Sequence, residues 1–193
     1  MPTSVNELFS IILHREPSNP IQWGGEIPCN SEGIYVISTL MPITSNDISD
    51  DKIKNWIDRV PAMRIDGLLP TPDLIKSRLS TFIYPDETIL YIGQTTDRTI
   101  RARIKEFHNH ILGNPSPHRG GHWLKTLNDM SLLNIYWAAV DNPGVIESTM
   151  LSHFRANVSE ESRNNLYDPL CAIPFANLQY RPRKVHNISK QCL

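Results

Sequence analysis

The sequence has few cysteines, no long hydrophobic run and almost no net charge. Its 193 residues include three cysteines, at positions 29, 171 and 192, and this odd, widely spaced set argues against a disulfide framework and a zinc site. No stretch approaches the ~20 apolar residues of a membrane span, so we expect no membrane association. The apolar run at 8–13 is short and lacks a basic leader, which favours an amphipathic helix over a signal peptide. The expected location is the reducing cytoplasm.

The net charge of −1 does not by itself indicate a nucleic-acid binder, but the charges are unevenly distributed. Basic residues cluster between positions 98 and 125 and again at 181–184, whereas acidic residues gather at 47–51, 86–87 and 160–161. This distribution predicts one positive face on a near-neutral protein. The alternative is that these charges form ordinary solvated helix faces.

The hydrophobic pattern predicts a single α+β domain over 1–193, with a small antiparallel sheet flanked by helices. Its hydrophobic content of 40% is enough to fill one core. The expected elements are a capped helix to about residue 14, strands at 33–40, 89–93 and 133–140, and helices near 47–59, from 72, at 97–112, after 121 and at 143–157.

Three further segments have expected roles outside this core. Residues 1–30 comprise the N-terminal helix and a proline-rich connector, and the tail from Tyr167 is expected to be rich in loops. Residues 41–86 are expected to form a helical insertion between the first two core strands. The apolar stripe of Ile53, Trp56 and Ile57 predicts that this insertion packs as a folded layer.

Two short apolar runs each place a tyrosine beside a glycine, in Gly33-Ile34-Tyr35-Val36-Ile37 and in Leu90-Tyr91-Ile92-Gly93. Arg103 follows in a helix, Glu147 in the first turns of another helix, and Asn177 in a later loop. In this order the residues resemble the GIY-YIG nuclease superfamily. The resemblance covers about 33–40 and 86–180, and it implies a GIY-YIG-like core. One departure is the insertion, because the two namesake runs usually lie close together.

The resemblance also implies an activity, the hydrolysis of phosphodiester bonds in DNA by a metal-dependent endonuclease. Tyr35 matches a tyrosine proposed to take a proton from the attacking water, and Tyr91 matches one that hydrogen-bonds around the scissile phosphate. A phenol with a pKa near 10 is a poor base, so neighbouring cations must lower this pKa or a metal-bound water must share the task. Arg103 would hold the phosphate with a bidentate guanidinium, and Asn177 would brace the site.

The same resemblance makes Glu147 the ligand of one Mg²⁺ or Mn²⁺ ion. A single carboxylate, retained waters and a substrate phosphate together suit magnesium. Without the resemblance, a glutamate here would be explained by the helix dipole.

Two positions depart from the family pattern. Phe107 lies where a tyrosine or histidine is common, four residues after Arg103, and Gln94 lies where some members carry a lysine. His108 and His110 flank Phe107. On an ideal helix His108 would be rotated about 140° from Arg103, and His110 about 20° but two turns away. We favour His108 as the sixth catalytic residue.

Several further side chains are expected to contact the nucleic acid. The segment 117–125 mixes glycines with basic and aromatic residues, which suits a groove for phosphates and bases, although it also fits a tight turn before a core helix. The expected contacts are Arg101, Lys105, His110, His118, Arg119, His122 and Lys125. In the insertion, Lys52, Lys54, Arg59, Arg64, Lys76 and Arg78 are candidates for phosphate contact, and the alternative for this segment is a structural or protein-binding role.

Two rival functions follow from the same residues. One is a catalytically idle nucleic-acid-binding module on the same scaffold, which the departures at Gln94 and Phe107 would favour. The other is a nuclease that acts on RNA or branched DNA. Because one metal site cuts one strand, double-strand cleavage would normally require a homodimer.

Overall fold

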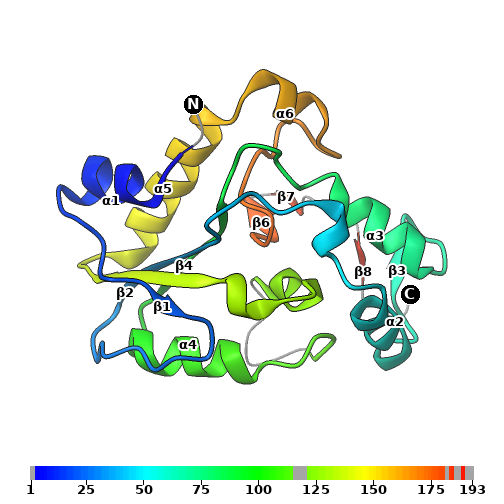
Figure 1. Ribbon diagram of the computed structural model, residues 1–193, viewed down its shortest axis with the longest axis horizontal. Coiled ribbons are helices and arrows are strands. Elements are labelled where there is room, and N and C mark those ends of the chain that lie inside the picture. Colours follow the sequence, from blue (N-terminus) through cyan, green and yellow to red (C-terminus); the bar gives the residue numbers. More distant parts are fainter. Residues whose placement is uncertain (1–2, 115–120, 181–182, 185–187, 190–193) are drawn as a thin grey trace.

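The computed structural model describes residues 3–114, 121–180, 183–184 and 188–189. Its centre is a four-stranded antiparallel sheet with the strand order β1-β5-β2-β4. These strands are β1 (Ile21–Gln22), β2 (Gly33–Ser38), β4 (Ile89–Thr95) and β5 (Asn134–Ala139). Helices flank the sheet on both sides (Figure 1). The predicted class, α+β with a small antiparallel sheet, is therefore confirmed.

Three helices cover the faces of the sheet, α1 (Val5–Leu13) and α5 (Pro143–Asn157) on one side and α4 (Ile100–Asn109) on the other (Figure 1). Each starts where the sequence provides a start signal. The Ser4 side chain accepts a hydrogen bond from the Glu7 amide, and the Thr99 side chain accepts one from the Ala102 amide. Pro143 occupies the first turn of α5.

The insertion between β2 and β4 is a folded layer that shares its core with the α4 face of the sheet. It contains a 3₁₀ helix, η1 (Ser45–Asp47), then α2 (Asp50–Arg59), β3 (Arg64–Ile65) and α3 (Pro72–Ser80), which lie at one end of the molecule (Figure 1). Ile53 and Trp56 are buried, and Ile57 packs partly buried against the same cluster. The predicted burial is therefore confirmed for Ile53 and Trp56, whereas Ile57 is only partly buried.

Several element boundaries differ from the sequence-based prediction. The helix expected at 97–112 spans only 100–109, because Thr99 caps its start and His110 has an extended backbone. The strand expected at 33–40 ends at Ser38, after a register shift in its pairing with β4. A short helix that was not expected, α6 (Glu160–Asn164), precedes the tail, and the loop-rich tail itself contains the two-residue strands β6 (Gln179–Tyr180), β7 (Arg183–Lys184) and β8 (Ile188–Ser189).

The short strands of the tail pair either with a distant segment or with each other. β8 pairs with β3 of the insertion, and β6 pairs with β7. Two 3₁₀ helices, η2 (His122–Thr126) and η3 (Met130–Leu132), connect α4 to β5. Among the residues described, no helix is long and apolar enough to cross a membrane.

Candidate active site

Tyr35 and Tyr91 meet on the α4 face of the sheet, directly above Gly93. In the antiparallel register Tyr35 lies opposite Gly93 and Ile37 opposite Tyr91, which places the two tyrosines diagonally on neighbouring strands. Their ring centroids are 5.9 Å apart. A Cβ atom on Gly93 would lie 2.5 Å from Cε1 of Tyr91 and 2.7 Å from the hydroxyl oxygen of Tyr35. The glycine therefore provides the space in which the two phenol rings lie.

Arg103 and Glu147 interact with this tyrosine pair. The two hydroxyl groups hydrogen-bond to each other, and the Arg103 guanidinium donates to the Tyr35 hydroxyl. Arg103 comes from the first turns of α4 and also pairs with Glu106 at 3.4 Å. The charge of Glu147, on α5, raises the pKa of both tyrosines. Four of the six expected catalytic residues thus form one electrostatically coupled group.

The pKa of Tyr35 moves in the direction opposite to that required of a general base. Burial raises it to about 12, outweighing the Arg103 charge and the hydrogen bonds from Tyr91 and Arg103, which lower it. The pKa of Tyr91 is also raised, again mainly by burial. Removing the Tyr35 proton at pH 7 would cost roughly 7 kcal/mol. The requirement that its surroundings lower this pKa is therefore not met by the protein side chains.

Asn177 braces the strand that carries Tyr91 and Gly93. Its side-chain oxygen accepts from the Ile92 amide at 3.0 Å, and its side-chain nitrogen donates to the Ile92 carbonyl at 2.7 Å. β4 is an edge strand, and the amide of Asn177 satisfies backbone groups that no neighbouring strand pairs. The adjacent Ala176 amide donates to the Leu90 carbonyl at 2.8 Å. The tail therefore fixes the outer edge of the tyrosine site.

His108 faces away from the tyrosine pair, toward β1. Its ring packs edge-on against Trp23 at 4.6 Å, and its Nε2 accepts from the Gly24 amide at 3.3 Å. Burial, together with the charge of Lys125, lowers its pKa to about 4, so it is neutral at pH 7. Phe107 is the side chain that contacts Tyr91, with ring centroids 5.7 Å apart. The structure therefore places His108 in the packing around Trp23 and does not bring it together with the tyrosine pair.

His110 and His122 form a buried pair between α4 and the insertion. Their rings are parallel, 6.1 Å apart, and the His122 ring also packs edge-on against Trp56 of α2. His110 lies beyond the end of α4, so the expectation that it shares a helix face with Arg103 is wrong. Both residues are less than 6% exposed, so the structure places these two expected contacts in the interior.

The remaining expected nucleic-acid contacts lie in different surroundings. Arg101 pairs with Glu26 at 3.0 Å and donates to the Ile27 carbonyl at 3.1 Å, whereas Lys105 is exposed. Lys125 is partly buried, and its ammonium donates to the His108 carbonyl at 2.8 Å. His118 and Arg119 lie outside the described residues.

Two residues that support the candidate site, Trp23 and Glu106, were not predicted from the sequence. The Trp23 ring packs against the Phe107 ring, with centroids 5.1 Å apart, behind the Tyr91 ring. The only sequence signal at Trp23 is that glycines follow it. Glu106 binds Arg98 at 2.6 Å as well as Arg103. Its spacing of three residues from Arg103 is a signal that could have predicted this ion pair.

The donor set at Glu147 is compatible with magnesium. No group of three or more His, Cys, Asp or Glu side chains gathers as a metal cage among the residues described. Magnesium does not require one, because it keeps several waters and binds substrate phosphates alongside one or two carboxylates. Glu147 is partly exposed, and its charge acts on both tyrosines. It therefore fits as a single carboxylate ligand beside a phosphate.

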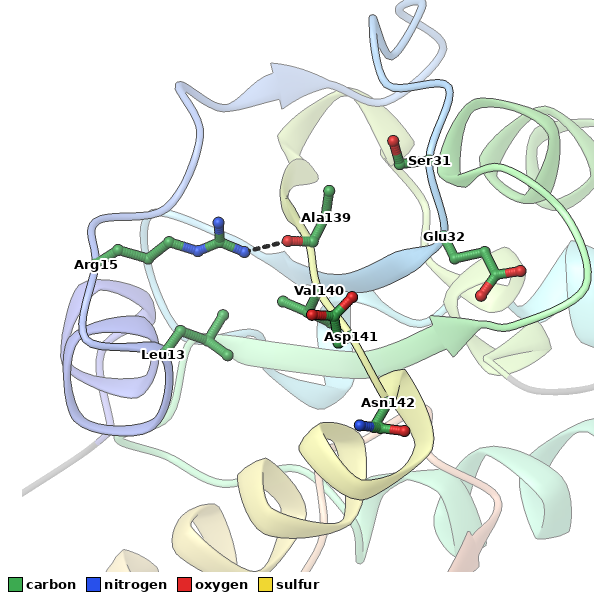
Figure 2. A pocket seen from close by; sticks show the side chains of 8 residues that line it. All are labelled: Leu13, Arg15, Ser31, Glu32, Ala139, Val140, Asp141 and Asn142. Carbon is green, nitrogen blue, oxygen red and sulfur yellow. Dashed lines mark hydrogen bonds between the residues drawn. The ribbon is translucent and has the colours of Figure 1, made fainter.

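A surface hollow of about 680 Å³ lies elsewhere, between the end of α1, the residues before β2 and the β5–α5 connection. Figure 2 shows Arg15 reaching across it to donate to the Ala139 carbonyl, with Glu32 and Asp141 at its rim. All three charged side chains are exposed. None of the coupled residues lines this hollow, so we place the candidate active site at the tyrosine pair.

Comparison of the chain with protein families, curated proteins and solved structures found no match. The candidate site therefore rests on its own geometry and on the sequence pattern that led to it.

Proposed function

We propose that this protein is an endonuclease that hydrolyses phosphodiester bonds in DNA with the help of one divalent metal ion. The observation that carries the proposal is the electrostatic coupling of Tyr35, Tyr91 and Arg103, on the α4 side of the sheet, with Glu147 near the start of α5. A core built only for stability would not need two buried phenols joined to a guanidinium and influenced by a carboxylate, because buried polar groups stabilise poorly.

The exposure of these residues assigns them different tasks. The Tyr35 side chain is 0% exposed and Tyr91 6%, whereas the Arg103 side chain is 22% exposed. Arg103 would therefore meet the scissile phosphate directly and stabilise the charge that develops on it. Tyr35 and Tyr91 lie behind Arg103 and would hold its guanidinium in the orientation for bidentate binding.

Glu147 would hold the metal ion, as Mg²⁺ or Mn²⁺. When bound, the ion would supply Lewis-acid polarisation of the phosphate and activation of a water. This division of labour is compatible with the high pKa of Tyr35, because the phenol then keeps its proton and acts by orientation. Asn177 would keep β4, and with it Tyr91, in register against β2.

The experiment that tests the proposal is a digest of defined substrates. Purified protein should nick supercoiled plasmid DNA in Mg²⁺ or Mn²⁺ and lose all activity in EDTA. Cleavage of RNA or of branched DNA in preference to duplex DNA would support the rival nuclease. Binding of DNA without cleavage in either metal would support the idle module and contradict our proposal.

A further inference from the structure

Lys125 and Lys52 bring two positive charges together on the flank of the candidate site. Lys125 belongs to η2 and Lys52 to the first turn of α2. Their ammonium groups donate to backbone carbonyls: Lys125 to His108 at 2.8 Å, and Lys52 to Leu127 and, at 3.3 Å, to Asn128. In the part of the chain described, no carboxylate lies within ion-pairing distance of either group.

The electrostatics of this lysine pair indicate a missing anion. Burial and, as a smaller cause, the charge of Lys52 together lower the pKa of Lys125 to about 8. Burial also lowers the pKa of Lys52, against an opposing effect of the exposed Asp129. Partly buried cations that repel one another gain from a neighbouring negative charge, because it offsets both the repulsion and the lost hydration.

The lysine pair is connected to the candidate site by aromatic side chains. The Lys125 ammonium lies 4.8 Å from the centroid of the Trp23 ring, in a cation–π contact. Trp23 packs edge-on against Phe107 at 5.1 Å, and Phe107 packs against Tyr91 at 5.7 Å. Only one aromatic side chain therefore separates Trp23 from the tyrosine pair.

We propose that Lys125 and Lys52 bind a non-scissile phosphate of the substrate strand, with Trp23 as the positioning residue that holds the Lys125 ammonium. The inference rests on the proposed function and adds to it the place where the strand is held beside the cleavage site. Two ammonium groups with free donor capacity suit a phosphodiester, which offers two anionic oxygens.

The first arm of the test measures binding of a short labelled DNA duplex in EDTA at several salt concentrations. Lys125→Met and Lys52→Met should each weaken binding by about tenfold and flatten the slope of log affinity against log salt by about 0.9. The matched control is Arg15→Met, since the Arg15 guanidinium also donates to a backbone carbonyl, that of Ala139, but lies at the surface hollow apart from the candidate site. This control should leave the slope unchanged.

The second arm uses the pH dependence of binding and does not depend on a disruptive variant. The affinity of the unaltered protein should fall as the pH rises through and above 8, where Lys125 loses its charge. Lys125→Arg keeps the charge and should reduce this fall to the part that Lys52, whose pKa is also lowered by burial, contributes. Around Lys125, His108 is already neutral and Asp129 already ionised in this range, so neither produces the same signal.

The outcomes separate this inference from the proposed function. An unchanged salt slope in both methionine variants, or the same fall with pH in Lys125→Arg, would overturn the phosphate subsite while leaving the nuclease proposal standing. Failure of the unaltered chain to bind DNA at all would overturn both. A Trp23→Phe variant should keep the slope, whereas Trp23→Ala should weaken binding less than Lys125→Met does.

Discussion

The two faces of the sheet are built from the same strands but differ in chemistry. Toward α1 and α5, β2 and β4 present the aliphatic side chains of Ile34, Val36 and Ile92, which pack without hydrogen-bonding groups. Toward α4 the same strands present Tyr35 and Tyr91, whose hydroxyls hydrogen-bond to each other, and Tyr35 also accepts a hydrogen bond from Arg103. Each face is equally well buried, so burial alone does not explain the difference.

This comparison separates a face built from aliphatic packing alone from the face that carries the proposed site. Aliphatic burial stabilises by roughly 25 cal/mol per Å² and needs no partner. A buried phenol stabilises only if its hydroxyl is satisfied, and here the satisfying partners include a guanidinium that is still partly exposed. The α4 face therefore accepts a less favourable arrangement than the other face, as expected of a site that acts on a ligand.

The largest effect should come from filling the space above Gly93. Gly93→Ala would drive a methyl group to 2.5 Å from Tyr91 and 2.7 Å from Tyr35, and overpacking of this kind costs about 1–3 kcal/mol. We expect this loss in urea unfolding and a loss of nuclease activity of more than about 10²-fold, since site misplacement of this size is severe. Gly144→Ala is the matched control, because nothing lies within 4 Å of its Cβ and it lies in a helix. Wild-type stability and activity in Gly93→Ala would contradict the packing described.

The next effect separates the tyrosines from their aliphatic neighbours. Tyr35→Phe should lower kcat by about 10²-fold, because it removes the hydroxyl that orients the Arg103 guanidinium, and Tyr91→Phe should lower it less. Because the pKa of Tyr35 is about 12, the pH–rate profile of Tyr35→Phe should keep its shape between about pH 6 and 9. Ile34→Val, on the opposite face, should cost about 0.5–1.5 kcal/mol of stability and leave kcat unchanged.

Near-native rates in both phenylalanine variants would leave these tyrosines as core residues. Loss of an inflection from the profile of Tyr35→Phe would show instead that the phenol titrates as a base.

The sequence predicted the core better than its edges. The helix at 143–157 and the pairing of two tyrosine-bearing strands follow from local signals, namely a proline at the first turn and contiguous β-branched residues. Two-residue strands such as β1 and β8 carry no periodicity and exist only because their tertiary partners are present. Tertiary packing likewise decided that His108 turns toward Trp23 and that His110 leaves the helix.

The candidate site shows the same limit. Order along the chain was enough to nominate Tyr35, Tyr91, Arg103 and Glu147, which prove to be coupled. The pKa of Tyr35 could not be foreseen, because it depends on the balance between burial and the Arg103 charge, and burial is a property of the folded chain.

A smaller effect is expected at the edge that Asn177 braces. Asn177→Ala removes two hydrogen bonds to Ile92 and leaves a buried backbone amide and carbonyl without them, which costs about 1–3 kcal/mol. Activity should fall by about tenfold, because Tyr91 loses its fixed register. Asn177→Asp keeps the hydrogen-bond acceptor, so its stability and activity should lie between those of the unaltered protein and those of Asn177→Ala. A fully stable Asn177→Ala would refute the bracing role.

The smallest effect concerns the aliphatic side, at whose margin Glu87 is a buried carboxylate. Burial raises its pKa to about 7, while the Thr3 amide, which donates to it at 3.1 Å, lowers it. This folded pKa exceeds the usual value of 4.5. The contribution of Glu87 to the free energy of unfolding is therefore fully present below about pH 4.5 and is lost as the pH rises through about 7.

The test compares thermal unfolding of the unaltered protein with Glu87→Gln from about pH 5 to 8. The stability of the unaltered protein relative to the variant should decline over this range, and taking the difference cancels the opposing contribution of His108. A difference that does not vary with pH would show that Glu87 titrates normally.

The most direct measurement of the central claim is plasmid nicking by Glu147→Ala in Mg²⁺, alongside DNA binding and thermal unfolding of the same variant. Glu147 is partly exposed, so its removal should spare the fold. We predict that cleavage is abolished, that DNA affinity in EDTA stays within about threefold of the unaltered protein, and that Glu147→Gln behaves alike. Full cleavage by either variant, or full cleavage by the unaltered protein in EDTA, would contradict the account.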